Sequence, residues 1–225
     1  MECLQLNRWQ IWIGKMKKAV IFGASGDLGS AFELELRNKG FDVSPFGRNE
    51  ILRESSTTIE ALGSFDPAEF YDVYVFCMGK FTVKSFVEFS EKEIDEEFEA
   101  NTILPIKLAL NILKACVASD RRQDFVFIGS TSAYEGFANT VPYSSAKFAL
   151  RGLVSALNSE YKNSQRRFFL ASMGTMQSKM GKKLIEQDFS TFLMPNRVAI
   201  RILDGVLDET GNFEPEIIIR RRVIR

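Results

Sequence analysis

The feature that most constrains the fold is a glycine-rich turn after the first apolar run of the chain. Residues 19–22 are apolar, and Gly23, Gly26 and Gly29 follow them at three-residue intervals. Residues 27–39 then have apolar positions at helical spacing. A glycine triplet between a strand and a helix is typical of the turn that binds the pyrophosphate of a dinucleotide. An ordinary tight turn is the simpler interpretation of the same residues.

Each glycine has its own expected role in such a turn. Gly23 permits the tight turn, Gly26 lets backbone approach a pyrophosphate, and Gly29 allows helix and strand to pack closely. The start of the following helix presents free N–H groups and a partial positive charge to phosphate. The predicted cofactor-binding segment is completed by Ser25, Asp27 and Leu28.

The rest of the chain repeats this order of short apolar runs and longer amphipathic stretches. Strands are expected at 19–22, 41–46, 73–77, 125–128, 167–171 and 216–219. Helices are expected at 27–39, 94–117, 143–161 and 195–207. This alternation predicts an α/β fold: a single doubly wound Rossmann-type domain over 16–225, with a mostly parallel sheet of about seven strands. Ligands then bind at the carboxyl ends of the strands.

Residues 1–15 precede this pattern and contain both tryptophans. They lack the basic start and the small-residue cleavage site of a signal peptide. We interpret them as an N-terminal appendage or a misassigned start. An amphipathic segment that covers a hydrophobic patch is the other interpretation.

Composition excludes several classes of protein. The 29 basic and 29 acidic residues balance, which argues against a nucleic-acid protein that relies on bulk electrostatics. The basic residues at 220–222 are interpreted as a solvated chain end. No run reaches the about 18 apolar residues that span a bilayer. Three cysteines without CxxC spacing and the absence of histidine predict no metal site, no disulfide framework and a cytoplasmic location.

Without histidine, proton transfer near neutral pH needs a carboxylate, Lys, Cys or Tyr with a shifted pKa. Tyr143 and Lys147 are four residues apart, on one face of a predicted helix. A lysine cation at about 4 Å, in an effective dielectric of about 20, stabilises a phenolate by up to about 4 kcal/mol. We therefore expect the pKa of Tyr143 to fall by as much as about 3 units. Ser130 follows the carboxyl end of the strand predicted at 125–128 and could hydrogen-bond the carbonyl oxygen that Tyr143 protonates.

Asn101 precedes Pro105 by four residues within the helix expected at 94–117. Because proline has no N–H, the carbonyl of residue 101 loses its helical partner and the helix tends to kink. That carbonyl can then hold a water for proton relay. A helix that starts near Pro105 is the other interpretation.

The second predicted strand ends in Gly47 and Arg48, without an acidic residue at its tip. A carboxylate there would bind the ribose 2′-hydroxyl of NAD, whereas an arginine accommodates the 2′-phosphate of NADP. The sequence therefore favours NADP, with Arg48 as the phosphate contact; NAD is the alternative cofactor. An Arg48 that is only a solvated loop residue is the competing interpretation.

Together these motifs, from about residue 17 to 207, resemble the short-chain dehydrogenase/reductase family. The resemblance implies a catalytic tetrad of Asn101, Ser130, Tyr143 and Lys147. It also implies that Lys147 binds the nicotinamide ribose and that the cofactor contacts Gly79, Gly174 and Ser178. The GxxGxxG spacing, and Cys77-Met78-Gly79 where the family has Asn-Ala-Gly, mark a divergent member.

The expected function is an NADP-dependent oxidoreductase that transfers hydride between nicotinamide and a small carbonyl or alcohol substrate. A nucleotide-sugar epimerase or dehydratase with tightly bound NAD(P), and a non-catalytic NADP-sensing module, are the alternatives. A substrate lid is expected at 175–195, with Phe81 and Phe137 beside it. The resemblance further implies a homodimer or homotetramer. The balanced charge and the absence of a long apolar run predict that the protein binds neither nucleic acid nor membrane.

Overall fold

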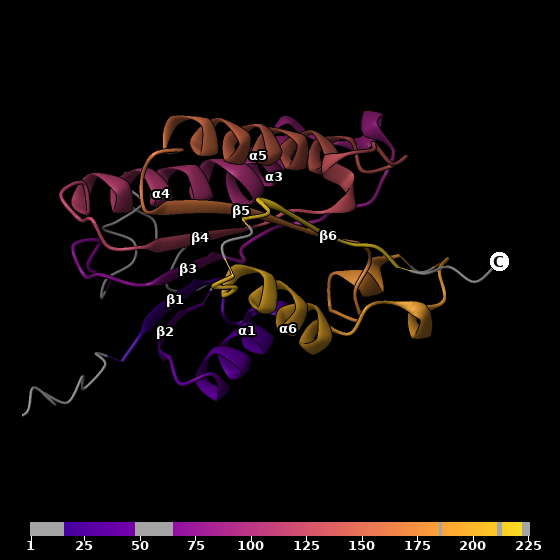
Figure 1. The fold of residues 1–225 in the computed structure, drawn as a ribbon. Helices are drawn as coiled ribbons and strands as arrows, with labels where there is room; N and C mark the ends of the chain where they lie inside the picture. The colour runs from indigo at the N-terminus through magenta and orange to yellow at the C-terminus, as the bar shows by residue number, and fades with distance from the viewer. Residues whose placement is uncertain (1–15, 48–64, 185, 211–212, 222–225) are drawn as a thin grey trace, which may run out of the picture.

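The computed structural model describes residues 16–47, 65–184, 186–210 and 213–221. Within them, six parallel strands form one sheet in the order β2-β1-β3-β4-β5-β6 (Figure 1). The strands are β1 (Lys18–Phe22), β2 (Asp42–Phe46), β3 (Val73–Phe76), β4 (Gln123–Ile128), β5 (Arg166–Met173) and β6 (Glu216–Ile219). The predicted doubly wound α/β fold is confirmed, with six strands where about seven were expected.

Helices cover both faces of the sheet (Figure 1). They are α1 (Asp27–Asn38), α3 (Glu91–Phe98), α4 (Leu104–Ala115), α5 (Val141–Glu160) and α6 (Pro195–Val206). Helices α1 and α6 pack on one face, and α3, α4 and α5 lie on the other. Single helical turns occur at η2 (Phe86–Glu88), η4 (Thr131–Ala133), η5 (Gly181–Lys183) and η6 (Phe189–Thr191). No helix of the described residues is long and apolar enough to cross a bilayer.

Stacked aromatic rings run across the sheet on the side of α4 and α5. The ring centroids of Phe76 and Phe127 are 4.5 Å apart, and those of Tyr74 and Phe125 are 4.7 Å apart. Phe125 in turn stacks on Phe168 at 5.0 Å. Because helices bury both faces of a parallel sheet, its strands read as continuous apolar runs rather than alternating ones. For this reason the strand positions predicted from sequence agree with the structure to within a few residues.

Helices α3 and α4 form one continuous helix through the π turn η3 (Glu99–Ile103). The helix begins with a capping box, in which the Ser90 hydroxyl accepts from the N–H of Glu93 and the Glu93 carboxylate accepts from the N–H of Ser90. The interpretation that a helix starts near Pro105 is therefore wrong. The π turn contains Asn101, at the point where Pro105 removes an N–H from the regular helical pattern.

The strand order places a crevice at one edge of the sheet. Strand β1 pairs with β2 on one side and β3 on the other, so chain connections leave it in opposite directions. Ligands of open parallel sheets bind at such a point, outside the carboxyl ends of the strands. The glycine turn follows β1, Gly79 follows β3, Ser130 follows β4 and Gly174 follows β5. All four therefore lie at this edge.

Candidate active site

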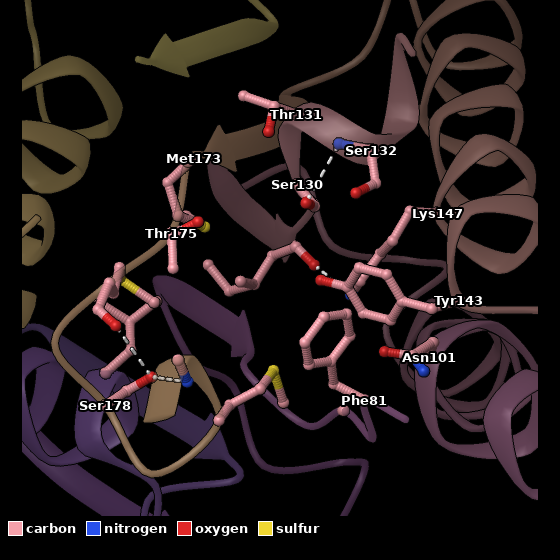
Figure 2. A pocket seen from close by; sticks show the side chains of 18 of the residues that line it. Phe81, Asn101, Ser130, Thr131, Ser132, Tyr143, Lys147, Met173, Thr175 and Ser178 are labelled. Atoms are coloured by element: carbon pink, nitrogen blue, oxygen red, sulfur yellow. Dashed lines mark hydrogen bonds between the residues drawn. The ribbon is translucent and has the colours of Figure 1, made fainter. Parts of the chain in front are cut away.

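A cavity of about 1080 Å³ opens at the carboxyl edge of the sheet (Figure 2). The predicted site residues that line it are Gly23, Ser25, Gly26, Asp27, Leu28, Gly79, Asn101, Ser130, Tyr143, Lys147, Gly174 and Ser178. Gly29 is buried below the glycine turn and does not line the cavity. Arg48 lies outside the described residues. Nearly all the residues singled out from sequence therefore share one cavity.

Two glycines of the turn are required by the chain itself. Gly23 has a φ of +96°, and a Cβ on it would lie 2.8 Å from the carbonyl carbon of Cys77. A Cβ on Gly29 would lie 2.2 Å from the carbonyl oxygen of Gly23. Neither position has room for a side chain. These geometries match the expected roles, a tight turn at Gly23 and close helix–strand packing at Gly29.

Gly26 is different, because a Cβ on it would meet the Gly23 carbonyl oxygen only at 3.4 Å. That is ordinary van der Waals contact, so the described chain does not itself demand glycine there. Gly26 is the N-cap of α1 and faces the cavity. The bare backbone leaves space for a ligand at a helix N-terminus, where N–H groups and the helix dipole favour an anion. A dinucleotide pyrophosphate fits this cradle.

The loop after β5 is held on two sides of the cavity. The N–H of Gly174 donates to the carbonyl of Ile219 at 2.9 Å, which ties the loop to the end of β6. The Ser178 hydroxyl is buried and accepts from the N–H of Gly181 at 2.9 Å. The N–H of Lys179 donates to the Asp27 carboxylate at 2.7 Å, which ties the loop to the start of α1. The expected lid thus contacts the glycine turn directly.

Tyr143, Lys147 and Ser130 converge on one wall of the cavity (Figure 2). Tyr143 and Lys147 lie in the first two turns of α5, and the Lys147 Nζ is 5.6 Å from the centre of the Tyr143 ring. The Lys147 ammonium donates to the carbonyl of Ile128 at 2.8 Å. The Tyr143 ring packs edge-to-face against Phe81, with centroids 4.7 Å apart. The Tyr143 phenol and the Lys147 ammonium are therefore both buried, with few polar groups around them.

The pKa of Tyr143 differs from the sequence prediction. Burial raises it to about 12; the charge of Glu97 adds to the rise, and the Ser130 hydroxyl acts against it. The expected fall assumed that a lysine charge dominates. In the structure, burial dominates, and the ammonium of Lys147 is hydrogen-bonded to Ile128. Burial also lowers the pKa of Lys147 to about 8, although Cys77 and Glu97 raise it in part.

The side chain of Asn101 is almost fully buried between α3 and the loop after β3. Its Nδ2 donates at 2.8 Å to the carbonyls of Lys80 and Glu97, and lies 3.2 Å from the Glu97 carboxylate. Its Oδ1 would be 2.9 Å from a Cβ on Gly79. Glycine at position 79 is therefore needed for the close approach of Asn101. This structural requirement is separate from the expected contact of Gly79 with the cofactor.

Sequence reasoning missed the burial of Glu97 and the position of Arg220 and Arg221 at the cavity. Glu97 has no exposed surface, although it lies in a run of acidic residues that predicts a solvated helix face. Arg220 and Arg221 line the cavity, and the Arg221 guanidinium donates to Gln187 at 3.0 Å. The sequence did contain a signal for the two arginines, because they directly follow the strand predicted at 216–219. Residues that follow a parallel strand lie at the same edge as the other strand ends.

Solved structures share this fold. A 4-hydroxyisoleucine dehydrogenase complexed with NADH matches with a TM-score of 0.75 and 17% identity, over 91% of this chain and 97% of that chain. An alcohol dehydrogenase from the archaeon Thermococcus sibiricus, complexed with 5-hydroxy-NADP, matches with a TM-score of 0.75 and 20% identity, over 94% and 98%. An actinorhodin polyketide ketoreductase with NADPH matches with a TM-score of 0.74 and 16% identity, over 91% and 95%.

Sequence comparison supports the same relationship. An uncharacterized short-chain type dehydrogenase/reductase of Sinorhizobium fredii, y4eK, is 28% identical over 167 residues. The match covers 68% of this chain and 64% of that protein, so the chain spans less than two thirds of this relative's length. The family model described as short chain dehydrogenase matches residues 71–188, more than half of the chain. That region contains Asn101, Ser130, Tyr143 and Lys147. The chain therefore belongs to the short chain dehydrogenase family.

Proposed function

We propose that the protein is an NADP-dependent oxidoreductase of the carbonyl reductase type. The observation that carries this proposal is the shared cavity, which joins the glycine turn at one end to Ser130, Tyr143 and Lys147 at the other. The similar solved structures are described as complexes with NADH, 5-hydroxy-NADP and NADPH, which supports a nicotinamide dinucleotide as the cofactor. The preference for NADP is proposed from Arg48. When bound, the nicotinamide supplies or accepts the hydride at C4.

Each side chain has a role that follows from its surroundings. Ser130 donates a hydrogen bond to the substrate carbonyl oxygen, and Tyr143 donates the proton that this oxygen takes up. A pKa of about 12 keeps Tyr143 protonated throughout the neutral range, as a proton donor requires. Lys147, with a pKa of about 8, is charged at neutral pH and can return a proton to the phenolate. The backbone carbonyl of Asn101 anchors the relay water.

Replacement of Tyr143 by Phe tests the mechanism. The Tyr143→Phe variant keeps the ring contact with Phe81 but loses the phenol proton. NADPH oxidation with an aldehyde and ketone panel should fall by about 100-fold or more. NADPH affinity, measured by fluorescence titration, should stay within about twofold of wild type. A fully active variant would refute this role of Tyr143. Retained cofactor without net NADPH consumption in the wild type would instead favour an epimerase or dehydratase.

Arg48 carries the NADP preference in this proposal. Loss of a charge-assisted bond to the 2′-phosphate should weaken NADP binding by about tenfold or more and leave NAD binding unchanged. Calorimetric titration of Arg48→Ala with both cofactors measures this. Arg201→Ala, which removes an equal charge from the exposed face of α6, is the matched control. Equal NADP affinity in both variants would remove Arg48 from the site.

We also propose that the protein forms a homo-oligomer through the region around α5. Phe137, Val141 and Phe148 are exposed apolar side chains that line a second, smaller hollow there. Contiguous exposed apolar surface marks interaction sites. Light scattering of the wild type and of Phe148→Glu tests this, and a monomeric wild type contradicts it.

A further inference from the structure

Glu97 is a buried carboxyl group on an acidic helix. Helix α3 has the sequence EKEIDEEF, and most of its acidic side chains are exposed or half-buried. Glu97 has 0% exposure. Fully buried glutamates are rare, because transfer of a carboxylate out of water is costly unless it is paired. Its burial therefore distinguishes Glu97 from the other acidic residues of α3.

The contacts of Glu97 orient the amide of Asn101. Three acceptors surround the Asn101 Nδ2: the Lys80 carbonyl, the Glu97 carbonyl and the Glu97 carboxylate Oε2. An amide oxygen in that position would face three acceptors without a proton to share, so only one orientation is compatible. The Asn101 Oδ1 is thereby directed toward Gly79 at the cavity wall.

Two oxygens of this pair remain without a partner. Among the described residues, neither the Glu97 Oε1 nor the Asn101 Oδ1 receives a hydrogen bond, and both atoms are buried. Unsatisfied buried acceptors are expensive. The two unpartnered oxygens belong to hydrogen-bonded neighbours, and Asn101 lines the cavity. Polar groups buried in this way lower the stability of the fold.

The charge of Glu97 reaches the groups that move the proton. It raises the pKa of Tyr143 and the pKa of Lys147. Among the described residues, Tyr143 and Cys77 are the other titratable groups near Lys147. Burial raises the pKa of each to about 12, so both are neutral at neutral pH. The ammonium of Lys80 is engaged elsewhere, with Glu96. Among the described residues, Glu97 is thus the carboxylate whose charge acts on Lys147.

We propose that Glu97 is a positioning residue of this site, which orients the Asn101 amide through its carbonyl and carboxylate and sets the electrostatic surroundings of Tyr143 and Lys147. It touches neither substrate nor cofactor and acts through these neighbours. The proposal rests on the proposed function for its effect on turnover. Its effect on Lys147 does not depend on that function.

The first experiment uses the full chain without cofactor. NMR titration of the Lys147 Cε signal, assigned by its loss in Lys147→Arg, should give a pKa lower by about one unit in Glu97→Gln than in wild type. Glu99→Gln removes the same charge two residues away, at an exposed position paired with Lys107, and should leave the Lys147 titration unchanged. An unchanged titration in Glu97→Gln overturns the proposal.

Glu97→Leu distinguishes positioning from a structural role. Leucine removes both the buried carboxyl and the negative charge that acts on the buried Lys147 ammonium, two changes with opposite effects on stability, so the Lys147 titration and the melting temperature are read together. The Lys147 pKa should fall as in Glu97→Gln. A lower melting temperature with an unchanged Lys147 pKa overturns the proposal and assigns Glu97 to stability. This variant also provides the test if Glu97→Gln does not fold.

The second experiment measures turnover. In NADPH-dependent reduction, kcat of Glu97→Gln should fall about tenfold, whereas KM for NADPH stays constant. The basic limb of the pH profile of kcat should move to lower pH, because the pKa of Lys147 is lower in this variant. Glu97→Asp keeps the charge on a shorter side chain, so its limb should remain in place while kcat falls. A wild type without reductase activity contradicts the proposed function alone, since the titration of Lys147 is independent of it.

Discussion

At the scale of single residues, two helical glycines make opposite demands. Gly29 in α1 has the Gly23 carbonyl where its Cβ would be, whereas a Cβ on Gly152 in α5 meets nothing within 4 Å. Gly29→Ala should therefore destabilise the fold by about 2 kcal/mol and weaken NADPH binding, because α1 must move away from the turn. Gly152→Ala should stabilise it by about 0.5–1 kcal/mol, since alanine is the better helix former. Urea denaturation compares them, and similar effects would contradict the packing role of Gly29.

At the scale of elements, the bond from the Lys179 N–H to Asp27 joins the expected lid to α1. Asp27→Ala removes this acceptor at the helix N-terminus, where a phosphate would also bind. Hydrogen exchange at 175–184 should then speed up by about fivefold or more, while α6 exchanges as in wild type. Mass spectrometry of exchanged peptides measures this. Unchanged exchange at 175–184 would mean that the lid is held by its other contacts.

Elements were predictable where burial makes a periodic pattern. Strands between two helical layers read as apolar runs, and amphipathic helices show their buried face. The burial of Glu97 was not predictable, because nothing in the sequence distinguishes it from the solvated acidic residues on either side. The raised pKa of Tyr143 was missed for a related reason. The sequence shows which charges are near in the chain but not how far water is excluded.

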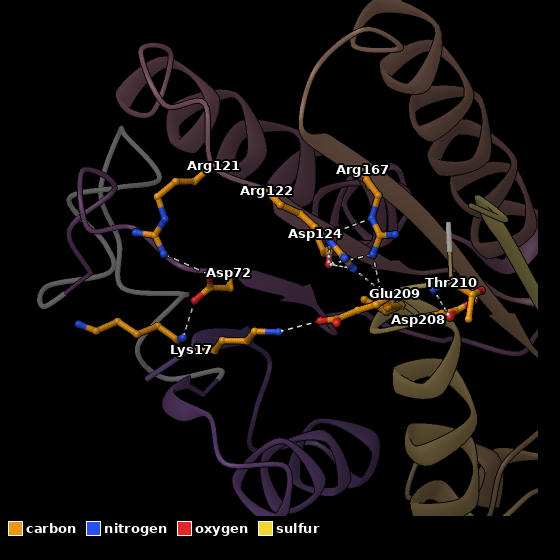
Figure 3. A network of polar contacts seen from close by, with 11 residues as sticks. Lys17, Asp72, Arg121, Arg122, Asp124, Arg167, Asp208, Glu209 and Thr210 are labelled. Atoms are coloured by element: carbon orange, nitrogen blue, oxygen red, sulfur yellow. Dashed lines mark hydrogen bonds and ion pairs between the residues drawn. The ribbon is translucent and has the colours of Figure 1, made fainter. Parts of the chain in front are cut away.

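At the scale of the whole molecule, the two ends of the sheet have different tasks. The cavity lies at the carboxyl ends of the strands, and an ion-pair network lies at the amino ends (Figure 3). There the Asp124 carboxylate, 4% exposed, accepts from Arg122 at 2.9 Å and from Arg167 at 2.7 Å. Both guanidinium groups also donate to the carbonyl of Val206, the last residue of α6. The network therefore joins β4, β5 and the C-terminus of α6.

This separation predicts that stability and activity can be changed independently. Asp124→Asn leaves the half-buried Arg122 and Arg167 without their carboxylate, so the free energy of unfolding should fall by about 3 kcal/mol. Glu209→Gln, which breaks the exposed pair with Lys17 at 3.2 Å, should change it by less than about 0.5 kcal/mol. Urea denaturation gives both values. In the folded Asp124→Asn protein, kcat for NADPH-dependent reduction should equal that of wild type, because the network is at the opposite end of β4 from Ser130. A fall in kcat without a fall in stability would mean that the two ends of the sheet are coupled.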